Sequence, residues 1–374
     1  MEKSLQMFDA AVVGAGIAGS SLAYFLSERG MKTAVIEKSG VASGASGAAG
    51  AFLSPMMGKG FLVEFTNTAL KFSLDLYDRI APDLLVRNGA ERFPKSDETY
   101  LSLLDDLAFI DLPHKKNESS VFFYDAGVIQ AERVCRRLLK GCALFERLEA
   151  SRPLYKNGVW HVGGYRAKIL AIAIGAYKTI APDWFTLMRG VWGERLLLRS
   201  DREIPHNLMG DVAISATFPD RTFALGATHK RAKSEWAVDE SAKDELLGKA
   251  KALKSDITNA EVLDVKGSMR PASSDYMPIA GALPDAAKTL ERYPHIVHGE
   301  KAEEHIYYPN LYLFTGHGSR GFVTAPYTAN LLAEEIAGKK AATALSPDRF
   351  LERTFRRKPY DWIKRNIDVE AGFG

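Results

Sequence analysis

A glycine-rich turn near the start of the chain constrains the fold more than any other feature of the sequence. Residues 11–21 read Ala-Val-Val-Gly-Ala-Gly-Ile-Ala-Gly-Ser-Ser, and Glu37 ends the next apolar segment. In a strand–turn–helix unit, Gly14 allows the tight turn, Gly16 lets the backbone approach a pyrophosphate, and Gly19 lets the helix pack against the strand. Glu37 stands where a carboxylate accepts hydrogen bonds from ribose hydroxyls. The pattern therefore predicts a dinucleotide-binding turn.

The segments around this turn have the periodicity that such a unit requires. Residues 8–13 are typical of a buried strand, 17–29 of a helix that Gly30 ends, and 32–37 of a second strand. The first free N–H groups of the helix would then point at phosphates. The alternative is a tight strand–helix turn that binds no ligand.

Composition excludes several other classes. Residues 10–26 carry no charge, but the three glycines, the two serines and the preceding Asp9 argue against a membrane span or a signal peptide. Cys135 and Cys142 match no metal-binding spacing and fit a reducing compartment. We therefore expect a cytoplasmic protein with no membrane span and no metal site. A net charge of +3 does not by itself name a partner.

The 374 residues indicate two domains or one elaborated domain. Residues 39–50 consist mostly of Gly, Ala and Ser, which suits a backbone that passes close to a large planar ligand; the alternative is a disordered linker. Periodicity and turn residues predict the remaining elements: helices over 62–80, 127–140, 239–254 and from 321 to 336, a hairpin around 156–158, a buried strand over 167–175, and a strand-rich segment over 192–228.

Nucleotide-type elements thus occur at the start, the middle and the end of the chain, with strand-rich material between them. This order predicts an α/β fold in which a Rossmann-like nucleotide domain is discontinuous and carries an inserted α+β substrate domain. We place the nucleotide domain at residues 1–55, 126–178 and 311–374, and the substrate domain at residues 56–125 and 179–310.

The chain resembles the D-amino-acid-oxidase-type flavoproteins, a family that includes glycine oxidase, sarcosine oxidase and D-amino-acid dehydrogenases. The residues that carry the resemblance are spread over nearly the whole chain: Gly14–Gly19, Glu37, Ala45–Gly47, Ile174–Ala176, Gly226–Thr228 and Arg270–Gly281. The resemblance implies a glycine-oxidase-like fold and an FAD-dependent oxidoreductase that acts on CH–NH bonds.

Within this family, four stretches are similar to the oxidase domain of the bifunctional enzyme of tRNA 5-methylaminomethyl-2-thiouridine biosynthesis: Gly47–Pro55, Leu225–Thr228, Arg270–Gly281 and Gly318–Gly321. In that enzyme the oxidase domain follows a methyltransferase domain. The present chain starts almost at its first strand, so we expect the methyltransferase to be absent.

The resemblance implies that the small-residue loop and the late glycine turn flank the flavin ring. Backbone N–H groups of residues 318–321 would then stabilise negative charge on the reduced ring; the alternative is a plain helix-capping turn. The residues expected to contact FAD are Gly14, Ala15, Gly16, Ile17, Ala18, Gly19, Glu37, Lys38, Ala45, Ser46, Gly47, Gly50, Ala51, Gly175, Gly318, Ser319, Arg320 and Gly321. We expect FAD to be bound without a covalent link.

Arg270 is the first candidate for holding a substrate carboxylate, because a guanidinium offers two parallel donors to that group and the family has an arginine at this Arg-Pro position. The alternative is a structural ion pair with Asp275 or Glu261. Arg320 is the second candidate catalytic residue; it reaches the substrate or the flavin, or it caps carbonyl groups of a neighbouring loop.

Other side chains near these motifs are expected to be structural. Hydride transfer from a carbon next to a neutral amine needs no general base, so His229 and His317 are expected to have no catalytic role. Tyr177 and Tyr276 are expected to pack rather than to take part in the chemistry.

The resemblance favours 5-carboxymethylaminomethyl-(2-thio)uridine in the anticodon loop of tRNA as the substrate, which would be cleaved to the 5-aminomethyl form and glyoxylate. The basic stretch from Arg353 to Arg365, with Tyr360 and Trp362 among its cations, suits RNA or is simply a solvated basic helix. Two alternatives stay open: an oxidase or dehydrogenase of free glycine, sarcosine or D-amino acids, and a flavin-binding sensor without turnover.

Overall fold

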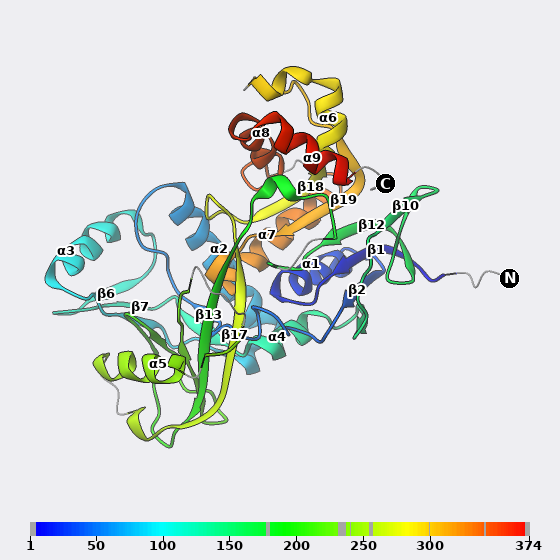
Figure 1. Ribbon diagram of the computed structural model, residues 1–374. Coiled ribbons are helices and arrows are strands. Elements are labelled where there is room, and N and C mark those ends of the chain that lie inside the picture. Colours follow the sequence, from blue (N-terminus) through cyan, green and yellow to red (C-terminus); the bar gives the residue numbers. More distant parts are fainter. Residues whose placement is uncertain are drawn as a thin grey trace.

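The computed structural model describes residues 5–176, 180–230, 237–239, 241–253, 257–298, 300–339 and 342–370. Its largest features are two eight-stranded sheets (Figure 1), and a third sheet has three strands. The strands of the first sheet are β1 (Met7–Val13), β2 (Thr33–Glu37), β9 (Ala143–Glu146), β10 (Leu154–Lys156), β11 (Val159–Val162), β12 (Tyr165–Ile172), β18 (Ile279–Pro284) and β19 (Tyr307–Thr315).

The centre of the first sheet is parallel, in the order β19-β12-β1-β2-β9. The hairpin β10–β11 continues it from the first half of β12, and β18 runs antiparallel to β19. Since β1, β2, β9, β12 and β19 all point the same way, their carboxyl ends lie at one edge, where ligands of open α/β sheets bind.

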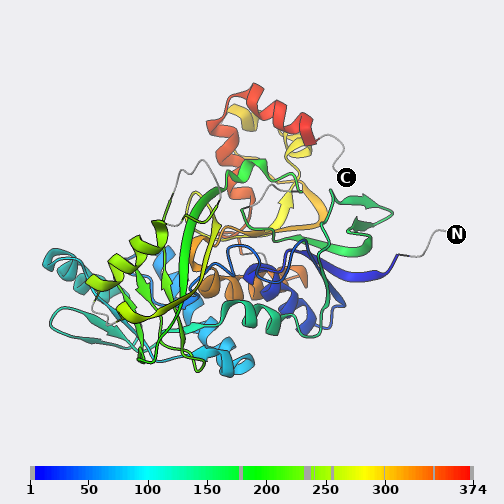
Figure 2. The ribbon, with the colours of Figure 1, turned by 60° about the horizontal axis from the view of Figure 1, so that its bottom comes forward.

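Helices cover both faces of this sheet (Figures 1 and 2). In β1, Ala10 and Val12 point into a core shared with α1, α2 and α7, whereas Ala11 and Val13 point into a core shared with α6, α8 and α9. The helices are α1 (Ile17–Glu28), α2 (Phe61–Ile80), α3 (Asp97–Asp106), α4 (Ala131–Leu138), α5 (Ser241–Ala252), α6 (Ala286–Arg292), α7 (Gly321–Ile336), α8 (Asp348–Arg357) and α9 (Tyr360–Glu370).

The second sheet has the order β17-β13-β16-β15-β14-β5-β7-β6 and packs α5 on one face. Its strands are β5 (Ala90–Arg92), β6 (His114–Lys116), β7 (Val121–Phe123), β13 (Arg189–Arg199), β14 (Asn207–Met209), β15 (Ala213–Ile214), β16 (Thr222–Gly226) and β17 (Glu261–Ala272). The third sheet joins β3 (Phe52–Leu53), β8 (Gly127–Ile129) and β4 (Leu85–Val86).

The mixed α/β class and the unit β1–α1–β2 are confirmed, with bounds within one residue of those expected. Residues 41–48 form a series of turns, so the disordered-linker alternative is wrong. The helix expected over 127–140 is partly wrong, because residues 127–129 are strand β8, which pairs with β3 and β4. Those partners come from distant parts of the chain, and local periodicity cannot reveal them.

The division into a nucleotide domain and a substrate domain stays a proposal, and its boundary at residue 178 lies outside the described residues. One element differs from that division. Strand β18 belongs to a segment assigned to the substrate domain, yet it is hydrogen-bonded to β19 in the first sheet. No helix of the described part of the chain is long and apolar enough to cross a membrane.

Candidate functional site

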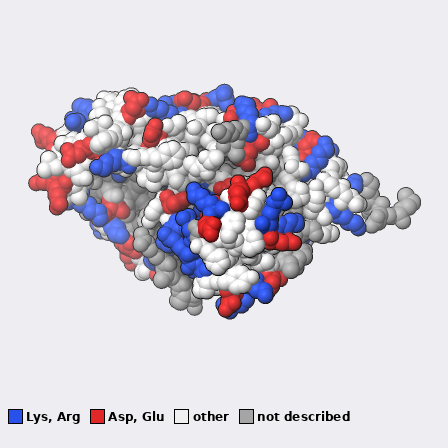
Figure 3. All heavy atoms as spheres, turned by 90° about the horizontal axis from the view of Figure 1, so that it is seen from above, with Lys and Arg blue, Asp and Glu red and all other residues white. Residues whose placement is uncertain are grey.

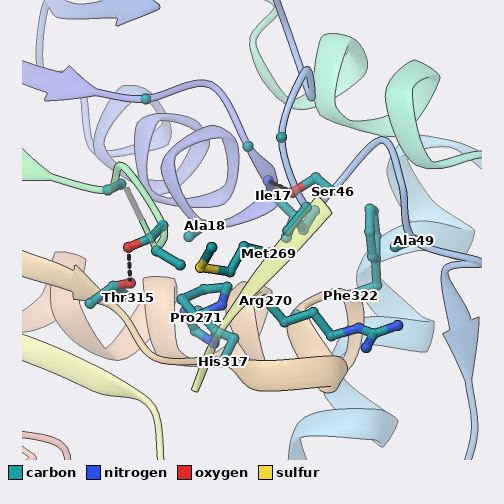
Figure 4. A pocket seen from close by; sticks show the side chains of 18 of the residues that line it. Ile17, Ala18, Ser46, Ala49, Met269, Arg270, Pro271, Thr315, His317 and Phe322 are labelled. Carbon is teal, nitrogen blue, oxygen red and sulfur yellow. Dashed lines mark hydrogen bonds between the residues drawn. The ribbon is translucent and has the colours of Figure 1, made fainter. Parts of the chain in front are cut away.

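A cavity of about 440 Å³ lies between the first two sheets, at the carboxyl ends of the parallel strands. Its size is within the range of about 300–1,000 Å³ that is usual for ligand pockets. The ends of β1, β2, β12 and β19 form one side, and residues 269–271 of β17 form another. Figure 4 shows Met269, Arg270 and Pro271 around the same space as Ile17 and Ser46.

The expected site residues that line this cavity come from five separate segments of the chain. They are Gly14, Gly16, Ile17, Ala18, Glu37, Lys38, Ala45, Ser46, Gly50, Ala51, Gly175, Arg270, Gly318, Ser319, Arg320 and Gly321. Ala15, Gly19 and Gly47 do not line it. These three residues lie outside the cavity lining, where they fix the shape of the glycine turn (Ala15 and Gly19) and of the small-residue loop (Gly47).

The turn between β1 and α1 requires glycine for two different reasons. Gly14 has a φ of +107°, and a Cβ atom added there would lie 2.5 Å from the carbonyl oxygen of Ala173. A Cβ atom at Gly19 would overlap the carbonyl oxygen of Gly14.

The amide of Ile17 donates a hydrogen bond of 2.9 Å to the Ser46 hydroxyl (Figure 4), so the small-residue loop is fastened to the N-terminus of α1.

Glu37 places a carboxylate at the edge of the cavity. Its side chain is 8% exposed, and its two oxygens accept hydrogen bonds of 2.9 Å from the backbone amides of Ala15 and Ser39. These bonds fix the rotamer of the side chain and link it to the glycine turn. The carboxylate retains acceptor capacity for a ligand, because each oxygen has two lone pairs.

Arg195 of β13, which the sequence analysis did not single out, contacts the small-residue loop without lining the cavity. Its Nη2 atom donates a hydrogen bond of 3.0 Å to the carbonyl oxygen of Gly47, although the side chain is only 8% exposed. Its Nε and Nη1 atoms have no partner among the described residues. Burial lowers the pKa of this guanidinium. The charge of Arg195 is thus held directly behind the small-residue loop.

A second helix N-terminus reaches the cavity from the other side. Residues 318–320 form a short 3-10 helix that leads into α7, and all of them line the cavity together with Gly321. A Cβ atom at Gly321 would lie 3.1 Å from the Cγ2 atom of Ile17, which shows how closely the starts of α7 and α1 approach each other. Two helix N-termini therefore face one cavity, and both favour negative charge.

His317 precedes this turn and is buried, with 8% exposure. The Thr324 hydroxyl donates to the carbonyl oxygen of Arg320 at 3.1 Å, so the proton on Nδ1 of His317 must donate to that hydroxyl oxygen, at 2.9 Å. Its Nε2 atom is then an acceptor, and it has no partner among the described residues. Burial lowers the pKa of His317 to about 3, so the ring is neutral at neutral pH.

Arg270 lies on β17 opposite Val191 of β13, and its guanidinium lies flat against Gly193. Its Nη1 atom donates to the carbonyl oxygen of Thr228 at 3.2 Å. Burial lowers its pKa, and no carboxylate of the described residues lies within ion-pair distance.

The acids that the sequence offered as partners of Arg270 are engaged elsewhere. Asp275 pairs with Arg349 at 2.9 Å, and Glu261 lies 3.8 Å from Arg199. The structural ion-pair alternative is therefore wrong for both of them. The guanidinium of Arg270 lines the cavity with donors to spare.

Gly193 is a sensitive point of this arrangement. A Cβ atom there would overlap the guanidinium carbon of Arg270 and both of its terminal nitrogens, although the backbone at Gly193 needs no positive φ. We expect Gly193→Ala to fold and to displace Arg270, with roughly a 10-fold rise in KM for a carboxylate substrate, since about 1.4 kcal/mol corresponds to one decade. Steady-state kinetics with Gly248→Ala as the control, a site where a Cβ atom meets open space, would check this. An unchanged KM would contradict it.

Arg320 and Arg92 add two more cations to the same cavity. Burial, with a smaller contribution from the charge of Arg92, lowers the pKa of Arg320 to about 10. The side chain of Arg320 forms no hydrogen bond with the described residues, so the alternative that it caps carbonyl groups is not what the structure shows. The sequence analysis missed Arg92, which stands in a short strand far from every glycine motif.

One further residue near the cavity, Tyr276, differs in exposure from what the sequence suggested. Tyr276 is 70% exposed and has a φ of +64°, so the expectation that it packs is wrong. The turn that carries it is held by Arg349, which bonds Asp275 and the carbonyl oxygen of Met277. His229 is exposed at the cavity wall, and Tyr177 lies outside the described residues.

The basic stretch at the C-terminus forms α8 and α9. Arg353 of α8 donates to the Ser274 hydroxyl at 3.1 Å, which links this helix to the loop after β17. Trp362 packs against Trp184, with ring centroids 5.5 Å apart, and is therefore not free to stack on a base. Figure 3 looks onto the α8 and α9 side of the molecule and shows Lys and Arg in separate groups with Asp and Glu between them.

The sequence is similar to a protein-family model and to curated proteins. The family model described as "FAD dependent oxidoreductase" matches residues 9–335. A curated relative from Legionella pneumophila (strain Philadelphia 1), the tRNA 5-methylaminomethyl-2-thiouridine biosynthesis bifunctional protein MnmC, is 26% identical over 94% of this chain and 58% of its own length. Its counterpart from Campylobacter hominis is also 26% identical, over 92% of this chain and 64% of its own length. The chain thus spans about three fifths of these relatives.

Solved structures show the same fold. Glycine oxidase from Geobacillus kaustophilus matches with a TM-score of 0.74 at 20% identity, covering 91% of this chain and 98% of its own. Iminodiacetate oxidase from Chelativorans sp. BNC1 matches with a TM-score of 0.72 at 16% identity, covering 90% of this chain and 98% of its own. The expected glycine-oxidase-like architecture is therefore confirmed.

Proposed function

Because this chain belongs to the family of FAD-dependent oxidoreductases, we propose that its cavity binds FAD and oxidises a secondary amine that carries a carboxylate. The preferred substrate is 5-carboxymethylaminomethyl-(2-thio)uridine in tRNA. The observation that carries the proposal is Arg270, a half-buried residue with no carboxylate partner among the described residues, in the cavity that begins at the glycine turn.

The residues present fit FAD. Gly14 and Gly19 bring β1 and α1 together so tightly that the helix N-terminus opens onto the cavity, which suits a pyrophosphate. The buried carboxylate of Glu37 at the end of β2 suits ribose hydroxyls. Residues 43–50 leave room for a flat ring, because all of them are Gly, Ala or Ser. When bound, FAD would accept the hydride from the carbon next to the substrate nitrogen.

The residues of the chain divide the remaining work. Arg270 would hold the substrate carboxylate with its two terminal nitrogens and so orient the adjacent methylene group. The N-terminus of α7 would stabilise negative charge in the cavity, by about 0.3–1 kcal/mol or up to ~2 kcal/mol in a dry site. His317 stays neutral in this environment and offers an acceptor rather than a proton.

The proposed reaction is a two-electron oxidation followed by hydrolysis. The C–H bond of the glycine unit breaks and the nitrogen loses its proton, which leaves a C=N double bond between the nitrogen and the carbon next to the carboxylate. Water then adds to this imine, and cleavage of the C–N bond releases glyoxylate and leaves the 5-aminomethyl group on the base. A wobble base must leave its stack to reach the cavity, which costs a few kcal/mol and least in a single-stranded loop.

Two observations support tRNA as the carrier of this substrate. The curated relatives named above are proteins of tRNA 5-methylaminomethyl-2-thiouridine biosynthesis, at 26% identity. Helices α8 and α9 carry four exposed cations: Arg356, Arg357, Lys364 and Arg365. These helices lie next to the loop after β17, because Arg353 of α8 donates a hydrogen bond to Ser274 of that loop. We further propose a cytoplasmic location, since that is where such a substrate occurs.

The test is nucleoside analysis of tRNA from a strain that lacks this gene. We expect 5-carboxymethylaminomethyl-uridine to accumulate, and the wild-type gene but not an Arg270→Met variant to restore the profile. An unchanged profile would contradict the tRNA substrate. Anaerobic mixing then separates the alternatives: bleaching of the flavin by glycine or D-alanine points to a free amino acid, and no bleaching by any substrate points to a sensor.

A further inference from the structure

Arg92 adds to the cavity a positive charge that has no role in the reaction proposed above. Strand β5 places its two charged residues on opposite faces of the second sheet. Glu91 faces away from the cavity and accepts hydrogen bonds from Ser120, at 2.6 Å, and from Asn117, at 3.1 Å. Arg92 faces the cavity, and its Nη2 atom donates to the carbonyl oxygen of Pro55 at 3.3 Å.

Among the described residues, the charge of Asp106 acts on that of Arg92 without forming an ion pair. No carboxylate of the described residues lies within ion-pair distance of it, and burial lowers its pKa. Arg320 lines the same cavity and is equally without an acidic partner in the described ranges. Two acids line the cavity in the described part of the chain, Glu37 and Glu149. Both lie at the end of the cavity opposite Arg92. They are neighbours there, because the backbone amide of Leu148 donates a hydrogen bond to the carbonyl oxygen of Glu37.

Two guanidinium groups that share a cavity repel each other, and burial removes part of the hydration of each. A ligand with negative charge between them reverses both effects, because charge-assisted hydrogen bonds replace the lost water. Arg270 already accounts for one carboxylate. With Arg270 assigned to that carboxylate, Arg92 and Arg320 remain without an ion-pair partner among the described residues.

We propose that Arg92, together with Arg320, forms a second anion-binding subsite, which takes a phosphate or carboxylate that the substrate carries in addition to the carboxylate held by Arg270. The proposal rests on the proposed function for the role of Arg270. It narrows the substrate class to secondary amines with two anionic groups, whether the second belongs to a nucleotide backbone or to a small molecule.

The experiment uses analogues in which sulfur replaces the amine nitrogen, so that binding is measured without turnover. Methylthioacetate carries one carboxylate, thiodiglycolate carries two, and (phosphonomethylthio)acetate carries a carboxylate and a phosphonate. Calorimetric titration of the flavin-loaded enzyme should show the two doubly charged ligands binding about 10-fold or more tightly than methylthioacetate, which corresponds to one charge-assisted hydrogen bond. The stronger of the two identifies the second group as phosphate-like or carboxylate-like.

In Arg92→Gln this preference should fall to about 2-fold or less, while the Kd of methylthioacetate stays unchanged. Arg92→Lys should keep part of the preference, and Arg199→Gln, which removes a surface cation of the same sheet, should keep all of it. Flavin content and thermal melting confirm that each variant is folded. Equal affinities in the wild type, or an undiminished preference in Arg92→Gln, would overturn the proposal. A tRNA profile that does not change in the gene deletion leaves this binding test intact, so the two failures are distinguishable.

Discussion

Replacement of Arg270 by methionine is expected to raise the KM of the carboxylate substrate by roughly 100-fold or more. Two charge-assisted hydrogen bonds contribute about 1.5–3 kcal/mol each, and every 1.4 kcal/mol corresponds to a factor of about ten. Methionine fills a similar volume beside Gly193 and removes the charge, so the strand pairing of β17 with β13 should stay intact. Steady-state kinetics and the Kd of methylthioacetate measure the effect.

Arg270→Lys separates the role of charge from that of geometry. Lysine keeps the positive charge but cannot reproduce the two parallel donors, so its KM should lie between those of the wild type and of Arg270→Met. Arg199→Lys is the matched control, since Arg199 is an exposed residue of β13 whose acid partner is 3.8 Å away. Near-normal kinetics in both Arg270 variants would remove this residue from the site.

Gly16→Val is expected to lower the affinity for FAD by about 10-fold or more and to leave the protein folded. The structure itself does not require glycine there: the φ of −73° suits any residue, and an added Cβ atom would meet the Ser46 side chain, with its hydroxyl oxygen at 3.1 Å. A side chain at this position would project into the space proposed for the pyrophosphate. Overpacking of a filled site typically costs 1–3 kcal/mol.

The measurement is the flavin content of the purified protein, followed by titration of the apoprotein with FAD. Gly30→Ala is the control, because Gly30 has a φ of +78° and open space around it, outside the cavity. That variant should lose about 1 kcal/mol of stability and keep its flavin. If Gly16→Val binds FAD as well as the wild type does, the pyrophosphate does not lie against this turn.

Local sequence patterns predicted the part of the site that depends on short stretches of chain. The three glycines of residues 14–19 could be interpreted from the sequence, because the strand, the turn and the helix that they shape follow one another directly in the chain. Glu37 could be placed for the same reason, as the next strand follows directly. The turn at residues 318–321 needed the family resemblance, since its place beside α1 depends on the parallel pairing of β19 with β12.

Other features depended on contacts between distant segments. Arg92 stands in a strand of three residues whose parallel neighbour is β14, more than a hundred residues away. Arg195 reaches Gly47 across the boundary between two sheets. Tyr276 was expected to pack, but Arg349 of α8 holds its turn in a conformation that exposes the ring. No periodicity within a single segment carries these relationships.

The sequence by itself therefore determined the α/β class, the glycine turn with Glu37, and the family to which the chain belongs. The first two depend on neighbouring residues, and the family depends on several short motifs spread along the chain. Only the tertiary structure decided which charges share the cavity. Arg270 has no acidic partner among the described residues, where Asp275 and Glu261 pair with other arginines. Arg92 lines the same cavity as Arg320 because sheet pairing brings β5 to that space. Two charges pair only when the folded chain brings them within a few ångströms of each other, and local sequence patterns do not determine such distances between remote residues.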